Sequence, residues 1–358
     1  MGAIRKILII RFSSIGDIVL SSPLLRILRT RYPEARIDFL VKSGYADLVR
    51  YNPHISSVIE LRSSKWNELN ALRKRVADER YDVVLDIHNG LRSRYLRQFS
   101  HAHTVGVIDK QVLKRWALVN FHWNLYSQDV PVVQRTIEAA NHGASLDIED
   151  DGQGLEVFVP NEISAKIATL LAHYGMKTSD AVVGIAPCAK HNTKMWLAER
   201  FTELAIRAVQ EMHAKILCLG GIDDAERCED IVQHINSACG SQKAHNVAGQ
   251  FSLLETSAAL DSCSAVVCND SAIMHLATAR KRPVIAIFGP TVREFGFFPY
   301  GDRSMVIEQK DLACRPCSHL GSERCPLGHF RCMKDTTVDH VFQALGILAP
   351  HPLKTTHL

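Results

Sequence analysis

The sequence contains no apolar run as long as the roughly 18 to 20 residues that a membrane-spanning helix needs. The longest apolar candidate, Lys6-Ile-Leu-Ile-Ile-Arg11, is short and carries a charge at each end. The N-terminus also lacks the apolar core and small-residue cleavage site of a secretory signal peptide. These absences argue against an integral membrane protein and against a secreted one, and we expect a cytoplasmic protein.

Several common ligand-binding motifs are absent as well. The chain has no Gly-x-Gly-x-x-Gly, no P-loop, no His-Glu-x-x-His and no Asp-x-Asp. A dinucleotide-dependent dehydrogenase and a metal-dependent transferase of the Asp-x-Asp type therefore both lose support.

The composition is that of an ordinary globular protein, with 358 residues, 46% of them hydrophobic and 22% charged. This length favours two domains. The net charge of +4 hides an asymmetry, because residues 1–144 hold 22 Lys and Arg against 13 Asp and Glu, whereas residues 145–358 hold 20 against 25. A specific anionic partner of the first half and solvated, arginine-rich helix faces explain this asymmetry about equally well.

Short β-branched runs alternate with amphipathic stretches, which is typical of βαβ units and parallel sheets. Five strands are predicted in each half: 6–12, 36–41, 58–61, 83–88, 104–107, 181–186, 215–219, 265–268, 284–288 and 305–308. The alternation breaks at an acidic, glycine-containing segment over residues 147–154. We therefore predict an α/β protein of two doubly wound parallel-sheet domains, residues 1–175 and 176–358. Ligands should bind at the carboxyl ends of the strands and in a cleft where the domains face each other.

Three strand-to-helix segments carry polar residues where ligands would bind. The first is Ser13-Ser14-Ile15-Gly16-Asp17, whose carboxylate either faces a ligand or caps the following helix. The second, Pro187–Trp196, contains Lys190 and Lys194, which suit a phosphate or form a solvated basic loop. In the third, Asn269-Asp270-Ser271 precedes a helix whose first N–H groups can bind an anion. His275 lies one helical turn after Ser271 on the same face, where it is either a ligand contact or structural.

Ten cysteines in a cytoplasmic chain predict thiols or metal ligands rather than disulfides. Six are scattered through predicted strands and helices and should be small core residues. The other four are Cys314, Cys317, Cys325 and Cys332. Four thiolates can form a closed tetrahedral metal site, with His319 or His329 as substitutes, or they stay free thiols. A zinc or iron ion there would be structural, since no ligand position stays open.

The three strand-to-helix segments together resemble glycosyltransferase family 9, the ADP-heptose:lipopolysaccharide heptosyltransferases. The matching residues are Ser13-Ser14-Ile15-Gly16-Asp17, Lys194-Met-Trp196 and Asn269-Asp270-Ser271-Ala272-Ile-Met-His275. The resemblance covers nearly the whole chain and implies a GT-B fold of two Rossmann-like domains. It places the acceptor on domain 1–175. The sugar nucleotide falls on domain 176–358, which contains the Cys-rich loop 314–332 and a C-terminal helix.

The resemblance also implies roles for individual residues. Asp17 matches the family's catalytic base, Lys194 matches a lysine on the donor phosphates, and Phe251 matches an apolar residue beside the adenine. A further set matches the donor-binding Asp-Thr-Gly-x-x-His motif: Asp270, Ser271, Ala272 and His275. Ser-Ala stands here where the family has Thr-Gly, so the helix start carries a Cβ that the family often lacks. Related autotransporter heptosyltransferases are similar in carrying a four-Cys metal finger.

The function that the resemblance implies is inverting transfer of heptose from ADP-heptose to an anionic acceptor of the lipopolysaccharide inner core, with no catalytic cofactor. The basic first half would face that acceptor and the inner face of the plasma membrane. Alternatives are a GT-B transferase or epimerase using another nucleotide sugar, and a heptosyltransferase acting on a protein or another glycan. Nucleic acid is not an expected partner, because the cysteines lie in the acidic half. We expect the Cys-rich loop to act separately from Asp17 and Lys194.

Overall fold

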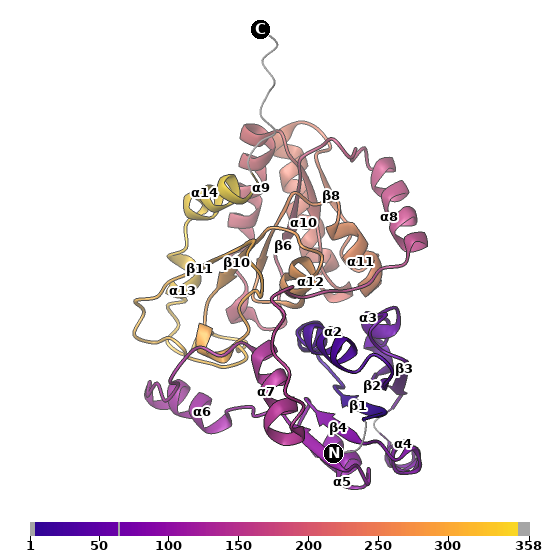
Figure 1. Cartoon of the computed structure of the whole chain (residues 1–358). Coiled ribbons are helices and arrows are strands. Elements are labelled where there is room, and N and C mark those ends of the chain that lie inside the picture. The colour runs from indigo at the N-terminus through magenta and orange to yellow at the C-terminus, as the bar shows by residue number, and fades with distance from the viewer. Residues whose placement is uncertain (1–3, 64, 350–358) are drawn as a thin grey trace. The chain divides into compact units, whose positions relative to one another are not determined.

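The computed structural model describes residues 4–63 and 65–349. The chain forms two compact α/β units, each built on one parallel sheet with its own hydrophobic core (Figure 1). The N-terminal unit contains the residues up to Val112 together with Val130–Phe158. The C-terminal unit contains Leu113–Asp129 and the residues from Val159 onward.

The sheet of the N-terminal unit has the strand order β3-β2-β1-β4-β5. Its strands are β1 (Lys6–Ile10), β2 (Arg36–Lys42), β3 (Ser57–Leu61), β4 (Val83–Asp86) and β5 (Thr104–Val107). Its helices are α1 (Ile15–Val19), α2 (Ser22–Arg31), α3 (Asp47–Arg50), α4 (Trp66–Glu79), α5 (Leu91–Gln98) and α7 (Val132–Ala144). The strand order changes direction between β1 and β4, and ligands of doubly wound sheets bind at such a point.

The sheet of the C-terminal unit has the order β11-β10-β9-β6-β7-β8 and changes direction between β6 and β9. Its strands are β6 (Val182–Ala186), β7 (Lys215–Cys218), β8 (Ala244–Asn246), β9 (Ala265–Asn269), β10 (Val284–Phe288) and β11 (Ser304–Glu308). Its helices are α8 (Asn161–His173), α9 (Ala198–Met212), α10 (Ala225–Cys239), α11 (Leu253–Leu260), α12 (Ala272–Ala279), α13 (Arg331–Lys334) and α14 (Val338–Leu348). Almost all of α6 (Val112–Phe121) also belongs to this unit.

The sequence pattern explains these elements directly. Buried apolar runs such as Val-Ile-Ala-Ile-Phe in β10 form strands that are covered on both faces. α9 buries Phe201, Leu204, Ala205 and Ala208, the spacing of one helix face, and ends where His213 adopts a left-handed conformation. No helix in the described part of the chain is long and apolar enough to cross a membrane.

The ten predicted strands all form, with bounds that differ by at most two residues. The sequence did not predict β8, because this strand is only three residues long and two of them are His and Asn.

The division of the chain differs from the expected boundary after residue 175. α8 belongs to the C-terminal unit because it packs on α11, where Lys166 Nζ lies 2.6 Å from Glu255 Oε1. The segment after Val112 also joins this unit, and Asn124 Nδ2 donates to Glu294 Oε1 at 3.1 Å. Tertiary contacts, which the local alternation of strands and helices does not reveal, decide to which unit each of these two segments belongs.

Candidate active site

Asp17 lies in the first turn of α1, directly after the central strand β1. Its Oδ2 accepts hydrogen bonds from the backbone N–H of Ser14 at 3.0 Å and from the Ser14 hydroxyl at 2.8 Å. Its Oδ1 pairs with the Arg11 guanidinium, and 17% of the Asp17 side chain is exposed. Asp17 therefore caps the start of α1, and its carboxylate is also within reach of solvent.

The surroundings of Asp17 keep it ionised. Burial acts to raise the pKa of this carboxyl, but the Arg11 charge and the two Ser14 hydrogen bonds outweigh burial, so the pKa lies below its ordinary value. The carboxylate is therefore in the form that can accept a proton at neutral pH.

Two further side chains, Arg11 and His88, belong to this cluster and were not predicted. Besides pairing with Asp17, Arg11 donates to the carbonyl oxygen of Ile87. The His88 ring lies 4.9 Å from the Phe12 ring, centroid to centroid. Burial and the Arg11 charge lower the pKa of His88 to about 4, so its imidazole is neutral at physiological pH. Arg11 and His88 follow β1 and β4, and searching the ends of both central strands would have found them.

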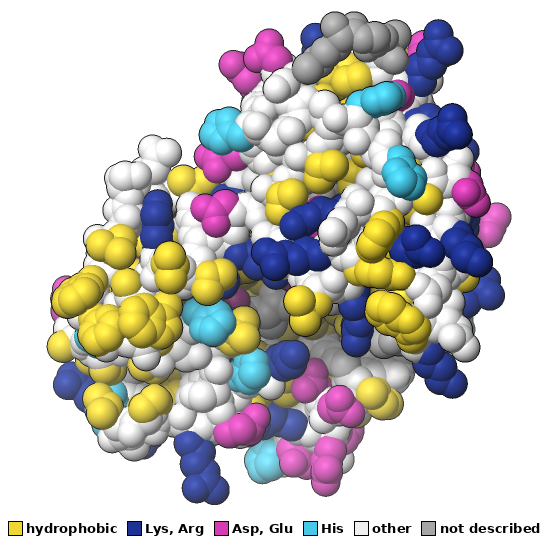
Figure 2. All heavy atoms as spheres, turned by 90° about the horizontal axis from the view of Figure 1, so that it is seen from below, with side chains coloured by type: hydrophobic (Ala, Val, Ile, Leu, Met, Phe, Trp, Pro, Cys, Tyr) yellow, Lys and Arg dark blue, Asp and Glu magenta, His cyan; other side chains and the backbone are white. Residues whose placement is uncertain are grey.

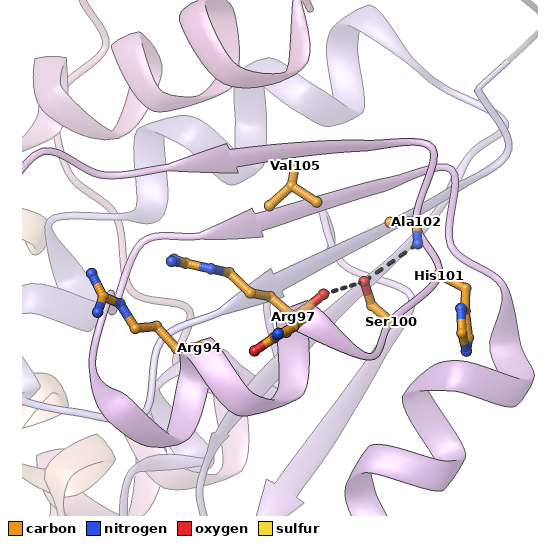
Figure 3. Close-up of a pocket in the computed structure, with 7 residues that line it drawn as sticks. Arg94, Arg97, Ser100, His101, Ala102 and Val105 are labelled. Atoms are coloured by element: carbon orange, nitrogen blue, oxygen red, sulfur yellow. Dashed lines mark hydrogen bonds between the residues drawn. The ribbon is translucent and has the colours of Figure 1, made fainter.

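A cavity of about 420 Å³ lies between α5 and β5 in the same unit (Figure 3). It is lined by Arg94, Arg97, Gln98, Ser100, His101, Ala102 and Val105. The Arg97 guanidinium is paired with the fully buried carboxylate of Asp86 at 2.7 Å. The Ser100 hydroxyl donates to the Arg97 carbonyl oxygen at 2.7 Å and accepts from the Ala102 N–H. Because Arg97 and Ser100 already have partners, we assign these two side chains no part in the site around Asp17.

In the C-terminal unit, Lys194 and Asp270 form a nearly buried ion pair. Lys194 Nζ lies 2.6 Å from Asp270 Oδ2, and the two side chains are 14% and 9% exposed. Lys194 ends the short 3-10 turn η2 (Asn192–Lys194) after β6, and Asp270 directly follows β9. Since β6 and β9 are neighbours, their carboxyl ends bring the two residues together. The Thr291 hydroxyl also donates to Asp270 Oδ2 at 2.8 Å.

Asn269 fixes the loop that carries Lys194. This buried residue ends β9, and its Oδ1 accepts from the backbone N–H of Trp196 at 2.9 Å. Its Nδ2 donates to the carbonyl oxygen of Pro187 at 2.9 Å, so one side chain holds both ends of the loop. The Trp196 indole is buried and donates to the Thr336 carbonyl oxygen at 3.0 Å. Trp196 is therefore a packing residue of this unit.

The start of α12 offers polar groups beside the ion pair. Ser271 is the N-cap residue and Ala272 begins the helix. The Ser271 hydroxyl oxygen is buried and has no hydrogen-bond partner among the described residues. His275, 4% exposed, follows one turn later on the same helix face. An anion at this helix start would satisfy the hydroxyl and the free N–H groups of the first turn.

Phe251 follows a different strand from the other predicted donor residues. It follows β8, which is two strands away from β6 in the sheet, and it is half-buried just before the N-cap of α11. No described contact joins Phe251 to Lys194 or to Asp270. Its role beside an adenine stays a prediction.

All ten cysteines lie in the described residues and are free thiols. Of the six that the sequence placed in the core, five are buried and Cys239 is half-buried. Burial and then the neighbouring thiols raise the pKa of Cys317, and burial raises the pKa of Cys332 to about 11. Nevertheless, no three His, Cys, Asp or Glu side chains between residues 4 and 349, residue 64 apart, lie together as metal ligands. As placed, the four loop cysteines do not form a ligand set, and their metal site stays a prediction.

We expected the Cys-rich loop to act separately from Lys194, and the structure places this loop directly against η2, which ends at Lys194. The Thr193 N–H donates to the Ser322 carbonyl oxygen at 3.0 Å, and the Ser322 N–H donates to Thr193 Oγ1 at 2.8 Å. Gly321 has a φ of +95°, and a Cβ there would lie 2.7 Å from His191 Cβ. The approach of the two loops therefore requires glycine at this position.

Arg315 links the same loop to the carboxylate of Asp270. This 3%-exposed side chain pairs with Glu308 at 2.9 Å and donates to the Thr291 carbonyl oxygen at 2.8 Å. Thr291 in turn donates its hydroxyl to Asp270. The Cys-rich loop therefore supports both members of the Lys194–Asp270 pair.

Comparison with known proteins places this site in a family. The model of glycosyltransferase family 9 (heptosyltransferase) matches residues 69–327, more than half of the chain. The chain belongs to glycosyltransferase family 9. It is 27% identical over 301 residues to lipopolysaccharide heptosyltransferase 2 of Salmonella typhimurium, covering 81% of this chain and 84% of that protein.

Solved structures of heptosyltransferases share the fold. The structure of Escherichia coli ADP-heptose lipopolysaccharide heptosyltransferase II has a TM-score of 0.73 and 24% identity, covering 96% of this chain and 98% of that one. The E. coli heptosyltransferase WaaC solved with ADP has a TM-score of 0.67 and 21% identity, covering 96% and 100%. The family 9 chain described here is thus a glycosyltransferase with the GT-B fold that the sequence implied.

The four loop cysteines lead to a prediction about metal content. We expect the purified protein to carry about one equivalent of zinc or iron, because four thiolates make a closed tetrahedral site. Since the loop supports Lys194, chelation should weaken binding of ADP as well as lower the melting temperature. Elemental analysis and calorimetry against ADP before and after chelation check this. Metal-free protein with four titratable thiols in the loop would reject the site.

Proposed function

We propose that this family 9 glycosyltransferase moves heptose, with inversion, from ADP-heptose to an anionic saccharide acceptor of the lipopolysaccharide inner core. The observation that carries the proposal is the Lys194–Asp270 pair at the start of α12, where Ser271 presents a buried hydroxyl without a partner among the described residues. A diphosphate is a ligand that such a site can hold, because it meets an ammonium group, a hydroxyl and free helix N–H groups.

On the donor side, Lys194 and the start of α12 would stabilise the ADP leaving group as negative charge develops on it. Asp270 orients the Lys194 ammonium and could also accept a hydrogen bond from a sugar hydroxyl. Asp270 is itself fixed by Thr291, so the position of Lys194 is set before the donor binds. Because Lys194 is already in position, less free energy is spent on ordering its side chain when the transition state forms.

On the acceptor side, the ionised carboxylate of Asp17 would accept the proton of the acceptor hydroxyl. The hydroxyl oxygen forms a bond to the anomeric carbon on the face opposite ADP, and the bond from that carbon to the diphosphate breaks. Arg11 holds the carboxylate in place, and neutral His88 can hydrogen-bond to an acceptor group without adding charge.

The basic residues of the N-terminal half fall into two sets. Two of those expected to face the acceptor are already engaged, since Arg97 pairs with Asp86 and Arg73 stacks over Phe99 at 5.2 Å. The other basic residues expected to face the acceptor are Lys74, Arg75, Arg92, Arg94, Lys110, Lys114 and Arg115. Because an inner-core acceptor is carried on lipid, we also propose that the enzyme works at the inner face of the membrane.

Titration calorimetry against ADP, UDP and GDP, followed by a transfer assay, tests the proposed donor. We expect ADP to bind most tightly and ADP-heptose to be consumed with release of ADP only when an inner-core acceptor is present. Tighter binding of UDP or GDP, or transfer from another nucleotide sugar alone, would refute the assignment of the donor.

The Arg11–Asp17 pair also predicts how activity depends on pH. In Arg11→Gln the positive charge is lost while burial remains, so the pKa of Asp17 should rise. The carboxylate would then be protonated at pH values where it is ionised in the parent protein. We expect the acidic limb of the profile of kcat/KM against pH to move to higher pH. Arg50→Gln, which removes an exposed pair with Asp47, is the matched control and should leave the profile unchanged. Superimposable profiles for Arg11→Gln and the parent would contradict Asp17 as the base.

A further inference from the structure

The helix α6 exposes the side chains that a helix of a globular protein usually buries. Its buried residues are only Ala117 and Leu118. By contrast, Leu113 is 79% exposed and Trp116 is 56% exposed. Exposed apolar side chains continue at the last helical residue, Phe121, and beyond it at Trp123 and Leu125. We call Leu113, Trp116, Phe121, Trp123 and Leu125 the aromatic patch. Figure 2 shows hydrophobic side chains gathered at the side of the molecule where α6 lies.

The backbone holds the aromatic patch in place. His122 adopts a left-handed conformation with a φ of 55°, and the Trp123 N–H donates to the Ala117 carbonyl oxygen at 3.3 Å. The left-handed residue ends the helix, and this hydrogen bond brings Trp123 back over the last turn. The Phe121 ring centroid lies 5.0 Å from those of both Trp116 and Trp123. The exposed rings are therefore ordered and mutually packed.

The charged residues within the segment that carries the aromatic patch have one sign, and the acidic Glu294 contacts this segment at Asn124. No acidic residue occurs between Asp109 and Asp129, whereas this stretch contains Lys110, Lys114 and Arg115. Lys114 is half-buried, with its ammonium 5.7 Å from the Tyr126 ring centroid. Aromatic and aliphatic groups beside lysine and arginine match the interface of a bilayer whose headgroups are negatively charged.

We infer that the aromatic patch is the surface by which this chain docks on an anionic lipid bilayer. The inference rests on the proposed function, in which the acceptor is carried on lipid, and it assigns the membrane contact to specific residues. A second copy of the chain fits this surface less well, because a symmetric contact would bring two basic, acid-free segments together. In the bilayer interface the rings leave water while the basic groups stay among lipid phosphates.

Co-sedimentation of the full chain with vesicles tests the inference. We expect binding to vesicles of phosphatidylethanolamine with phosphatidylglycerol and little binding to vesicles of phosphatidylcholine alone. The double substitution Trp116→Ser with Trp123→Ser should weaken binding by about tenfold or more, because two large apolar side chains no longer leave water. Lys114→Gln should weaken it about fivefold at low salt, the effect of one basic group near an anionic surface.

The matched control is Trp66→Ser, which removes an equally exposed tryptophan, 60% exposed, from the N-terminal unit. This variant should bind the vesicles as the parent does. Brominated lipids should quench the fluorescence of Trp116 and Trp123, and buried Trp196 serves as the unquenched reference. Affinity for ADP and the melting temperature of the double variant report whether it is folded.

Vesicle binding by the double variant at the level of the parent overturns the inference. A smaller mass of the lipid-free double variant by light scattering, with vesicle binding unchanged, would also overturn it and show an interface between copies. Failure of the proposed function gives a different result, since the protein would then show no heptose transfer while its vesicle binding still depends on Trp116 and Trp123.

Discussion

Replacing Asp17 by Asn should abolish most heptose transfer while leaving the affinity for ADP unchanged. The amide keeps an oxygen that can accept the Ser14 hydrogen bonds, so the start of α1 is preserved. What is lost is the group that accepts the proton of the acceptor hydroxyl. Removing a general base costs roughly 10² to 10⁴ in rate, and we expect kcat to fall within that range.

The matched control for this variant is Asp47→Asn. Asp47 is also a first-turn aspartate of a short helix in the N-terminal unit, and it pairs with Arg50 at 2.9 Å on the surface. Its substitution should leave kcat unchanged. If Asp17→Asn keeps kcat near that of the parent and only lowers the melting temperature, Asp17 is a helix cap, whose loss costs about 0.5–2 kcal/mol, and not the base.

The strands could be predicted from the sequence because each depends on a local run of apolar, β-branched residues. Buried β-branched runs predicted ten strands, and the neighbouring strands β6 and β9 then brought Lys194 and Asp270 together. The same reasoning missed Arg11 and His88. Each fell inside a predicted strand, 6–12 or 83–88, and only the pairing of β1 with β4 places both beside Asp17.

Contacts between distant loops could not be predicted from the sequence. Thr193 and Ser322 are far apart in the chain, and their hydrogen bonds depend on the positive φ of Gly321. Likewise, nothing in the local pattern of α6 shows that it groups with the C-terminal unit rather than with the strands that precede it. The contact between the Cys-rich loop and the loop that carries Lys194 was therefore not predicted.

Replacing Lys194 by Ala should cost more than the loss of one phosphate contact. The variant leaves the carboxylate of Asp270, 9% exposed, with the Thr291 hydroxyl but without its positive partner. That charge would then repel the diphosphate that the site is proposed to bind. Loss of one preorganised electrostatic group lowers kcat by about 10² to 10³, and we expect at least this loss in kcat/KM together with weaker ADP binding. Lys190→Ala, which removes an exposed lysine from the same loop, should change neither quantity.

A double-mutant cycle separates phosphate binding by Lys194 from its support of Asp270. In Lys194→Ala with Asp270→Asn, the uncompensated buried charge is gone, so the melting temperature should recover toward that of the parent. If Lys194 contacts the diphosphate, ADP affinity stays low in the double variant, because the neutral amide removes the repulsion but supplies no ammonium group. We would measure the affinity by calorimetry with ADP, which lacks the transferred sugar. Any contact of Asp270 with that sugar then cannot affect the result. Recovery of both the melting temperature and the ADP affinity would show that Lys194 serves only to balance the charge of Asp270.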